Sequence, residues 1–284
     1  MKTEGRSLRE IQRVEKKKRK RRITAFVLLV SFLLYRFVFS LLLMSSNITV
    51  TAHRGSTNVA PENTVASVLE AIAVNADYVE IDVQLTKDGE VILLHDATFK
   101  RVAGVPIRAS ELTYEEIQAL NVGFYKMETI DFRAPLLKEV LDVCTLSSVK
   151  LNIELKNYDK NEILPYKVVE IIKAYDFIDR CVVTSYSQSF LKTVKRLCPE
   201  IKVGLITNSS SIATYVKCRF VDLYSIRYIS LTPSIVMYIH SQHKEVYCWT
   251  PSTKIAIETA IMAGADNIIT NNVVLARLLI VSSK

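Results

Sequence analysis

The sequence predicts an α/β protein whose main domain is a (β/α)8 TIM barrel with an inserted hairpin and loop, preceded by one transmembrane helix. Three observations lead to this fold class. Short strand-like runs alternate with longer amphipathic segments over residues 45–284, and such alternation indicates a parallel sheet. Eight strand-and-helix units fit into these 240 residues, near the roughly 250 that are typical of the barrel. A 22-residue apolar run stands ahead of them. A doubly wound open sheet is the alternative that this pattern leaves open.

The first element is a basic tail over residues 1–22. It carries eleven Lys and Arg against three Asp and Glu, which equals the net charge of +8 of the whole chain. The other 262 residues therefore balance to zero. A neutral body argues against nucleic acid as a partner of the folded domain, and attraction of the tail to anionic lipid is the better expectation.

The second element is a transmembrane helix over residues 23–44, whose single charge is Arg36. Twenty-two helical residues rise about 33 Å, enough for a hydrocarbon core of roughly 30 Å. The basic block at 16–22 keeps the N-terminus in the cytoplasm by the positive-inside rule. The sequence thus predicts a single-pass protein of the cell membrane with an extracytoplasmic barrel domain. A cleaved signal peptide and a helix lying on the membrane surface remain as alternatives.

The third element is the barrel domain at 45–284. The motif at 61–64 is expected to start the first barrel helix, with Asn63 as its N-cap. Further helices are expected at 64–75, 162–175, 189–197, 253–262 and 273–281. The expected barrel strands are 49–53, 78–83, 149–155, 181–184, 202–206, 220–225, 245–249 and 267–270.

One segment interrupts the alternation. The run at 91–95 follows the strand at 78–83 too closely for a parallel crossover, and residues 86–89 have turn composition. The two runs should therefore form an antiparallel hairpin. Residues 96–133 then form an insertion, helical around 113–120, of the length that often builds substrate loops.

The turn of this hairpin predicts which side chains face each other. If Lys87 and Asp88 form its centre, Glu80 lies opposite His95. Cross-strand partners in an antiparallel pair lie side by side on one face. This register would place a carboxylate next to an imidazole.

Five cysteines occur without a close pair. Their odd number and mostly apolar neighbours favour buried free thiols over a zinc site or a disulfide framework. They are Cys144, Cys181, Cys198, Cys218 and Cys248.

Acidic and imidazole side chains gather at the carboxyl ends of the expected strands. His53 and His95 end two of these runs, and this rim of a TIM barrel holds active sites. Glu80 and Asp82 share one strand face, and Glu154 lies near the end of another strand. Three converging carboxylates repel each other unless a cation binds, and hard oxygen ligands suit Mg²⁺ or Ca²⁺. Two histidines beside such an ion can supply a general base and a general acid.

Arg54 and Lys156 are the natural partners for phosphate oxygens in such a site. Each residue also has a plain structural interpretation. A strand-end histidine is often structural, a Glu-x-Asp pair is often a solvated strand face, and Lys156 can simply neutralise Glu154. The position of all these groups at one end of the strand pattern favours the site.

Many ordered motifs over residues 50–274 resemble the glycerophosphodiester phosphodiesterase family. The resemblance implies a TIM barrel, with His53 and His95 as the acid–base pair and Trp249 as a residue that lines the pocket. It further implies that a divalent cation binds to Glu80, Asp82 and Glu154, and that phosphate binds to Arg54 and Lys156. The matching motifs are His53-Arg54-Gly55, Pro61-Glu62-Asn63-Thr64, Glu80-Ile81-Asp82-Val83, Thr86-Lys87-Asp88-Gly89, His95-Asp96, the run 134–141, Glu154-Leu155-Lys156, Ser185-Tyr186, Trp249-Thr250 and the run 264–270.

Two departures from the family pattern stand at the rim. Pro251 and Ser252 replace Val-Asn after Trp249-Thr250, and Asn271 replaces the usual Asp. Both are expected to lie away from the metal and the histidines, and so to affect the substrate pocket more than the chemistry. His240 and His243 match no motif and are expected on the surface of a helix.

The resemblance implies a phosphoric diester hydrolase. The expected reaction is metal-dependent hydrolysis of glycerophosphodiesters to glycerol 3-phosphate and an alcohol, with two-histidine acid–base catalysis. One alternative is hydrolysis of lysolipids in the manner of a lysophospholipase D. Another is an inactive barrel that acts as a binding protein at the membrane. The sequence leaves open which histidine is the acid, which ion binds and which alcohol leaves.

Overall fold

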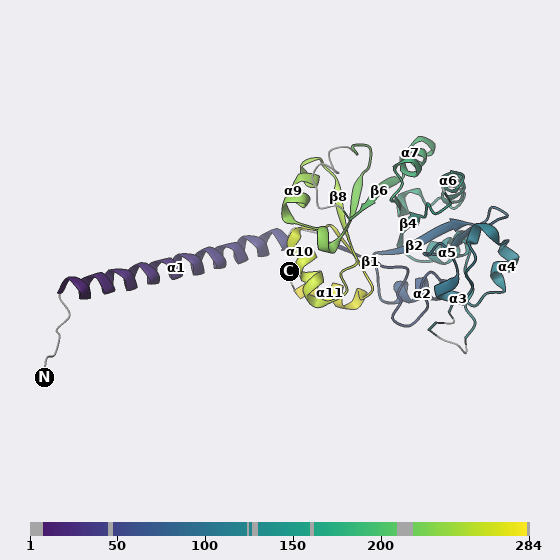
Figure 1. Ribbon diagram of the computed structural model, residues 1–284. Coiled ribbons are helices and arrows are strands. Elements are labelled where there is room, and N and C mark those ends of the chain that lie inside the picture. The colour runs from purple at the N-terminus through teal and green to yellow at the C-terminus, as the bar shows by residue number, and fades with distance from the viewer. Residues whose placement is uncertain are drawn as a thin grey trace. The chain divides into compact units, whose positions relative to one another are not determined.

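The computed structural model describes residues 8–44, 48–123, 125–126, 130–159, 162–208 and 218–282 (Figure 1). The chain divides into two compact units, residues 1–46 with 283–284 and residues 47–282. In the first unit, α1 (Leu8–Met44) is one continuous helix. Among the described residues, no helix has the length and apolarity that crossing a bilayer requires. The span at 23–44 stays a prediction, and the side chains of 35–44, including Arg36, lie outside the described residues.

The second unit is the predicted barrel. Within its described residues, eight parallel strands run in the order β1-β9-β8-β7-β6-β5-β4-β2. The ring closes because β1 pairs with both β9 and β2. An open sheet has two edges, so this closure excludes the doubly wound alternative. The strands are β1 (Thr49–Ala52), β2 (Tyr78–Leu85), β4 (Lys150–Leu155), β5 (Cys181–Ser185), β6 (Lys202–Thr207), β7 (Leu223–Arg227), β8 (Glu245–Trp249) and β9 (Asn267–Thr270).

Helices lie around the outside of the barrel (Figure 1). In α5, Leu137, Val140, Leu141 and Cys144 are buried, at the spacing that places residues on one helix face. The helices of this unit are α2 (Val65–Ala73), α3 (Lys100–Ala103), α4 (Tyr114–Gln118), α5 (Leu137–Thr145), α6 (Leu164–Ala174), α7 (Gln188–Leu197), α9 (Pro233–Ser241), α10 (Lys254–Ala263) and α11 (Val273–Ser282).

Helix α2 begins one residue later than predicted. Its N-cap is Thr64, whose hydroxyl accepts from the Ser67 N–H at 3.1 Å while the Ser67 hydroxyl accepts from the Thr64 N–H at 3.2 Å. The prediction that Asn63 caps the helix is therefore wrong. Asn63 has a φ of 54°, a left-handed conformation that asparagine tolerates better than most residues. Its side chain is free to point toward the barrel.

The predicted hairpin is present, but its register differs by one residue. Strand β3 (Val91–Leu93) pairs antiparallel with the end of β2, and Val83 lies opposite Leu93. The expected pairing of Glu80 with His95 is therefore wrong, because a shift of one residue exchanges the faces of a strand. His95 instead follows the end of β3 and reaches the site from the next segment of chain.

The turn length explains this shift. The Thr86 N–H donates to the Glu90 carbonyl at 2.9 Å, so three residues rather than two lie between the paired positions. Gly89, the last of the three, has a φ of 82°. A three-residue hairpin loop requires a left-handed residue there, and glycine provides it at low cost.

The insertion at 96–133 forms a small core of its own. Its buried side chains pack with Ile92 and Leu94 of the hairpin, whereas Ile107, Tyr125 and Ile130 are exposed. The cluster consists of Ile92, Leu94, Phe99, Val102, Ala109, Ile117, Val122 and Ala134. The five cysteines are free and buried, as predicted.

Candidate active site

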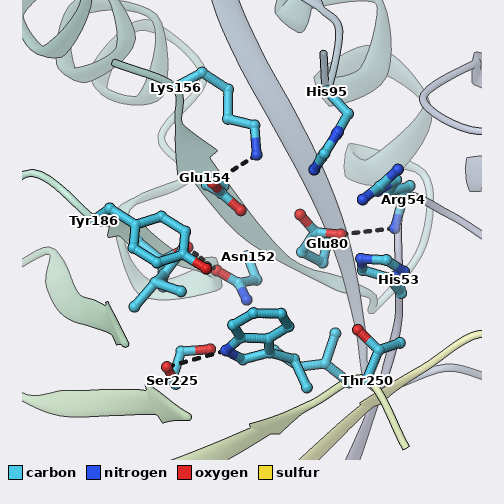
Figure 2. Close-up of a pocket in the computed structure, with 14 residues that line it drawn as sticks. His53, Arg54, Glu80, His95, Asn152, Glu154, Lys156, Tyr186, Ser225 and Thr250 are labelled. Carbon is cyan, nitrogen blue, oxygen red and sulfur yellow. Dashed lines mark hydrogen bonds and ion pairs between the residues drawn. The ribbon is translucent and has the colours of Figure 1, made fainter. Parts of the chain in front are cut away.

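A cavity of about 110 Å³ opens at the carboxyl ends of the barrel strands (Figure 2). Seven of the eight predicted site residues line it, namely His53, Arg54, Glu80, His95, Glu154, Lys156 and Trp249. Asn152, Thr184, Tyr186, Ile206, Ser225, Thr250 and Ile269 complete the lining. Asp82, the eighth, is fully buried within the acidic cluster beside this cavity.

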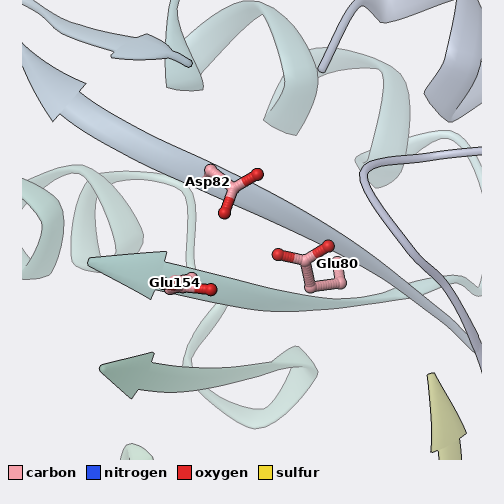
Figure 3. Close-up of side chains that lie close together, drawn as sticks. All are labelled: Glu80, Asp82 and Glu154. Carbon is pink, nitrogen blue, oxygen red and sulfur yellow. The ribbon is translucent and has the colours of Figure 1, made fainter. Parts of the chain in front are cut away.

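The three predicted metal ligands form one cluster (Figure 3). Each of Glu80, Asp82 and Glu154 offers a carboxylate oxygen, and these oxygens lie within 4.8 Å of one another. Glu80 and Asp82 share a face of β2, and the register of β2 with β4 places Asp82 beside Glu154. Adjacent parallel strands thus bring the acids together.

The charge balance of this cluster suits a bound cation. Burial, together with the charges of Asp82 and Glu154, raises the pKa of Glu80 well above its usual value. Burial, with a contribution from Asp82, raises the pKa of Glu154 to about 7. Such shifts mean that the carboxylates resist being ionised together. A divalent cation would remove this repulsion, and the all-oxygen donor set fits Mg²⁺ or Ca²⁺.

Asp82 is the member that stays ionised. Burial opposes its charge, but Lys156, His95 and Arg54 together hold its pKa below the usual range. Its Oδ1 lies 3.0 Å from Lys156 Nζ but accepts no hydrogen bond of good geometry from the described residues. A buried carboxylate oxygen without a hydrogen bond is costly, so this atom is available to a metal ion.

Lys156 and Asn63 hold the acidic cluster in place. Lys156 Nζ donates to Glu154 Oε1 at 2.7 Å and lies beside Asp82, and its side chain is 6% exposed. The Asn63 amide donates to Asp82 Oδ2 at 2.8 Å and accepts from the Asp82 N–H at 3.0 Å. Both contacts fix the orientation of the Asp82 carboxylate.

His53 is held by Asn271, in contrast to the prediction that Asn271 lies away from the histidines. Ring Nδ1 of His53 is 2.8 Å from the Asn271 Oδ1. The barrel closure explains the contact, because Ala52 pairs with Thr270 and the next residues are these two. Burial and the nearby charge of Arg54 lower the pKa of His53 to about 4. The ring is therefore neutral near pH 7, with Nδ1–H donating to the amide oxygen and Nε2 left as an acceptor.

At His95, a carboxylate contacts the Nδ1 atom, whereas an amide does so at His53. Its Nδ1 lies 2.7 Å from Asp96 Oδ1, and Arg101 Nε donates to Asp96 Oδ2 at 2.6 Å. Arg101 also forms a two-pronged pair with Glu62, at 2.7 and 2.8 Å. Burial lowers the pKa of His95, while Asp82 and Asp96 act to raise it. The two histidines thus differ in the charge of their partners.

Arg54 joins this ionic chain to the site, where Figure 2 shows it beside Glu80. Its NH1 donates to Glu62 at 3.1 Å, its backbone N–H donates to Glu80 Oε2 at 2.7 Å, and its Nε lies 3.6 Å from Asp82. The guanidinium lines the cavity with its position fixed from behind. A fixed guanidinium suits two-pronged binding of phosphate.

Trp249 forms part of an aromatic wall. Its indole N–H donates to the Ser225 carbonyl at 3.1 Å, and its ring meets Tyr186 edge-on at 6.4 Å between centroids. Ser252 Oγ accepts from the Asn271 N–H at 3.3 Å. The two departures from the family pattern therefore lie beside each other at this rim.

Several cavity residues were not identified from the sequence. Asn152 lies two positions before Glu154, so strand periodicity assigns both to one face, and its Oδ1 accepts from the Thr184 hydroxyl at 2.8 Å. Tyr186 directly follows β5 and could have been found by its place at a strand end. His240 is exposed on α9 and pairs with Asp266, and His243 follows the end of that helix.

Comparison with known proteins bears on the identity of this site. The model of the glycerophosphoryl diester phosphodiesterase family matches residues 53–275. A glycerophosphodiester phosphodiesterase of Caldanaerobacter subterraneus subsp. tengcongensis is 32% identical over 231 residues, covering 78% of this chain and 93% of that one. A lysophospholipase D of Rattus norvegicus is 36% identical over a shorter stretch, covering 44% of this chain and 40% of its own.

Solved structures show the same barrel. A phosphodiesterase of Oleispira antarctica, solved with the product sn-glycerol-3-phosphate, has a TM-score of 0.77 and 25% identity, covering 82% of this chain and 96% of that one. A glycerophosphodiester phosphodiesterase of Agrobacterium tumefaciens has a TM-score of 0.71 and covers 81% of this chain and 99% of its own. At 21% identity the second likeness concerns the fold.

Proposed function

The chain belongs to the glycerophosphoryl diester phosphodiesterase family and is a phosphodiester hydrolase, and we propose that it cleaves glycerophosphodiesters to glycerol 3-phosphate and an alcohol. The observation that carries this is one cavity lined by two histidines, an arginine, a lysine and two of the three clustered carboxylates. The Oleispira antarctica relative was solved with sn-glycerol-3-phosphate, the product expected here.

The size of the cavity suits a bare glycerol group. A volume of about 110 Å³ gives room for roughly seven water-sized positions at about 15 Å³ each, and glycerol has six heavy atoms. The apolar side chains of the insertion mostly pack into its own core. Both features favour a deacylated substrate over a lysolipid. Lysolipid hydrolysis is the second candidate because the rat relative is a lysophospholipase D.

The two histidines divide the proton transfers. His53 is neutral, and its Nε2 accepts no hydrogen bond from the part of the chain that the structure describes, which suits a general base. It takes a proton from the attacking water as the new P–O bond forms. If the glycerol 2-hydroxyl attacks instead, a cyclic phosphate forms first, and water then opens it to glycerol 3-phosphate. His95, supported by Asp96, gives its proton to the alcohol oxygen as the old P–O bond breaks. Two groups in different environments have different pKa values, so one site can supply both an acid and a base at one pH.

The cationic side chains bind the phosphodiester. Arg54 and Lys156 face the cavity and contact its non-bridging oxygens. A Mg²⁺ or Ca²⁺ ion at Glu80, Asp82 and Glu154 would offset the negative charge of the substrate and its transition state. Asn63 keeps Asp82 oriented for such an ion.

Substitution of each histidine tests the proposal. His53→Ala and His95→Ala should each lower kcat for glycerophosphodiester hydrolysis by about 10²–10⁴-fold, the usual contribution of a general acid or base. Thermal unfolding should remain close to that of the wild-type protein. His240→Ala, an exposed histidine outside the cavity, is the control and should keep full activity. Near-normal turnover in either site variant would refute the assignment. The same assays with a lysolipid as substrate test the second candidate.

We further propose that residues 23–44 tether the catalytic domain to the cell membrane, with the basic residues 1–22 on the cytoplasmic side. The apolar run and its flanking charges support this. Alkaline carbonate extraction should leave the full-length protein in the membrane fraction. A protease added outside the cell should remove the barrel domain, and a protected barrel would contradict the orientation.

A further inference from the structure

A second hollow borders the catalytic cavity. This groove, of about 470 Å³, shares His95, Glu154, Lys156 and Tyr186 with the cavity. Its other lining residues are Leu155, Asn157, Tyr158, Ser185 and Ser187, from the segments that follow β4 and β5. His53 and Trp249 line the cavity but not the groove.

This division separates the two ends of a phosphodiester. His95 lines both spaces, whereas His53 lines the cavity alone. If glycerol occupies the cavity near His53, the phosphorus lies by Arg54 and Lys156, and the other ester oxygen points to the groove. His95 then stands beside the oxygen that leaves. The alcohol attached to that oxygen extends into the groove.

Two aromatic rings are among the exposed side chains of the groove. Tyr158 is 44% exposed and Tyr186 is 53% exposed. Burial raises the pKa of Tyr158, and it raises the pKa of Tyr186 to about 12. Both phenols are therefore neutral near pH 7. Each ring therefore offers an uncharged aromatic face to a ligand beside the active site.

The charges of the groove are already paired among the described residues. Glu154 Oε1 accepts from Lys156, and His95 faces Asp96. Glu154 is also a candidate metal ligand. Glu154 is the one carboxylate among the described lining residues of the groove, and its pairing with Lys156 makes it a weak partner for the N–H groups of a primary ammonium. A quaternary ammonium has no N–H groups, and it is attracted to the faces of aromatic rings.

We propose that this groove binds the leaving alcohol and that Tyr158 and Tyr186 select a quaternary-ammonium alcohol of the choline type. The inference rests on the function proposed above, because the groove has this role only if the cavity holds glycerol. Asn157 is exposed and Ser187 is half-buried, so water reaches the cation and its positive charge remains partly solvated. Selectivity therefore comes from the two rings.

A pair of esters that differ in charge alone tests this selection. Glycerophosphocholine carries the quaternary ammonium, and its 3,3-dimethylbutyl analogue replaces nitrogen by carbon with nearly the same shape. The full-length protein should have a higher kcat/KM for the choline ester by about four- to 25-fold, the product of two rings worth about two- to fivefold each. Tyr158→Leu and Tyr186→Leu should each lower this ratio by about two- to fivefold.

Conservative variants and a matched control separate the effect of the aromatic face from the effects of the hydroxyl group and of losing an exposed tyrosine. Tyr158→Phe and Tyr186→Phe keep the aromatic face and should keep the ratio. Tyr166→Leu removes a tyrosine of equal exposure, 44%, on α6 outside the groove, and should leave the ratio unchanged. Turnover of the neutral ester by each variant reports an intact fold and intact chemistry.

Three results would overturn the inference. A wild-type ratio near one, or leucine variants with an unchanged ratio, would show that the rings do not select the cation. Phenylalanine variants that lose as much as leucine variants would assign the effect to the hydroxyls. The proposed function fails separately, if the wild-type protein hydrolyses neither ester with Mg²⁺ or Ca²⁺ present.

Discussion

Replacement of Asn271 by aspartate should make His53 more basic. The substitution keeps the shape of the side chain, so the Oδ1 that lies 2.8 Å from His53 Nδ1 stays in place. It adds one negative charge beside the ring. A carboxylate favours the protonated imidazole, so the pKa of His53 must rise.

The size of this shift follows from the contact distance. Two charges about 4 Å apart attract by about 4 kcal/mol at an effective dielectric constant near 20, and by about 1 kcal/mol in bulk water. His53 is half-buried and Asn271 is exposed, so the site lies between these limits. At 1.36 kcal/mol per pKa unit, the expected rise is roughly one to three units.

The pH dependence of hydrolysis measures the change. A general base acts when it is unprotonated, so the rate falls as the pH drops through its pKa. With the pKa of His53 at about 4, the acid limb of kcat/KM for the wild-type protein lies near that pH. Asn271→Asp should move this limb up to roughly pH 5–7. The two proteins should converge at higher pH, where His53 is neutral in both.

A neighbouring asparagine supplies the control. Asn272 caps the start of α11 by accepting from the Leu275 N–H at 3.1 Å, and aspartate caps a helix equally well. Asn272→Asp therefore adds the same charge one residue away and should move the limb far less. An active Asn271→Asp protein whose acid limb coincides with that of the wild type would refute the assignment of His53 as the base.

Three other perturbations have defined outcomes. Asp96→Asn removes the carboxylate behind His95, which lowers the pKa of the acid, and the alkaline limb of kcat/KM should move to lower pH; an unmoved limb would exclude His95 as the acid. Asp82→Asn should weaken Mg²⁺ or Ca²⁺ binding by at least tenfold in calorimetry, and unchanged affinity would place the ion elsewhere. Lys156→Met removes the nearest cation from two buried carboxylates, so the metal-free protein should lose about 3–5 kcal/mol of unfolding free energy, with partial recovery on adding Mg²⁺; a loss that Mg²⁺ leaves unchanged would argue against the cation site.

The sequence by itself determined the fold class and most of the candidate site. Strand and helix periodicities act along the chain, so they predicted the eight barrel strands and assigned Glu80 and Asp82 to one face. The ordered motifs predicted the family that the comparisons confirm. The span at 23–44 is also a pattern along the chain, and it stays a prediction.

The tertiary structure decided which side chains meet. The hairpin register depended on a three-residue turn with Gly89 at positive φ, and local composition did not distinguish this from a two-residue turn. Asn271 reaches His53 across 218 residues because β9 and β1 are neighbours in the closed barrel. Contacts of this kind depend on where strands meet in space, and periodicity along the chain carries no information about them.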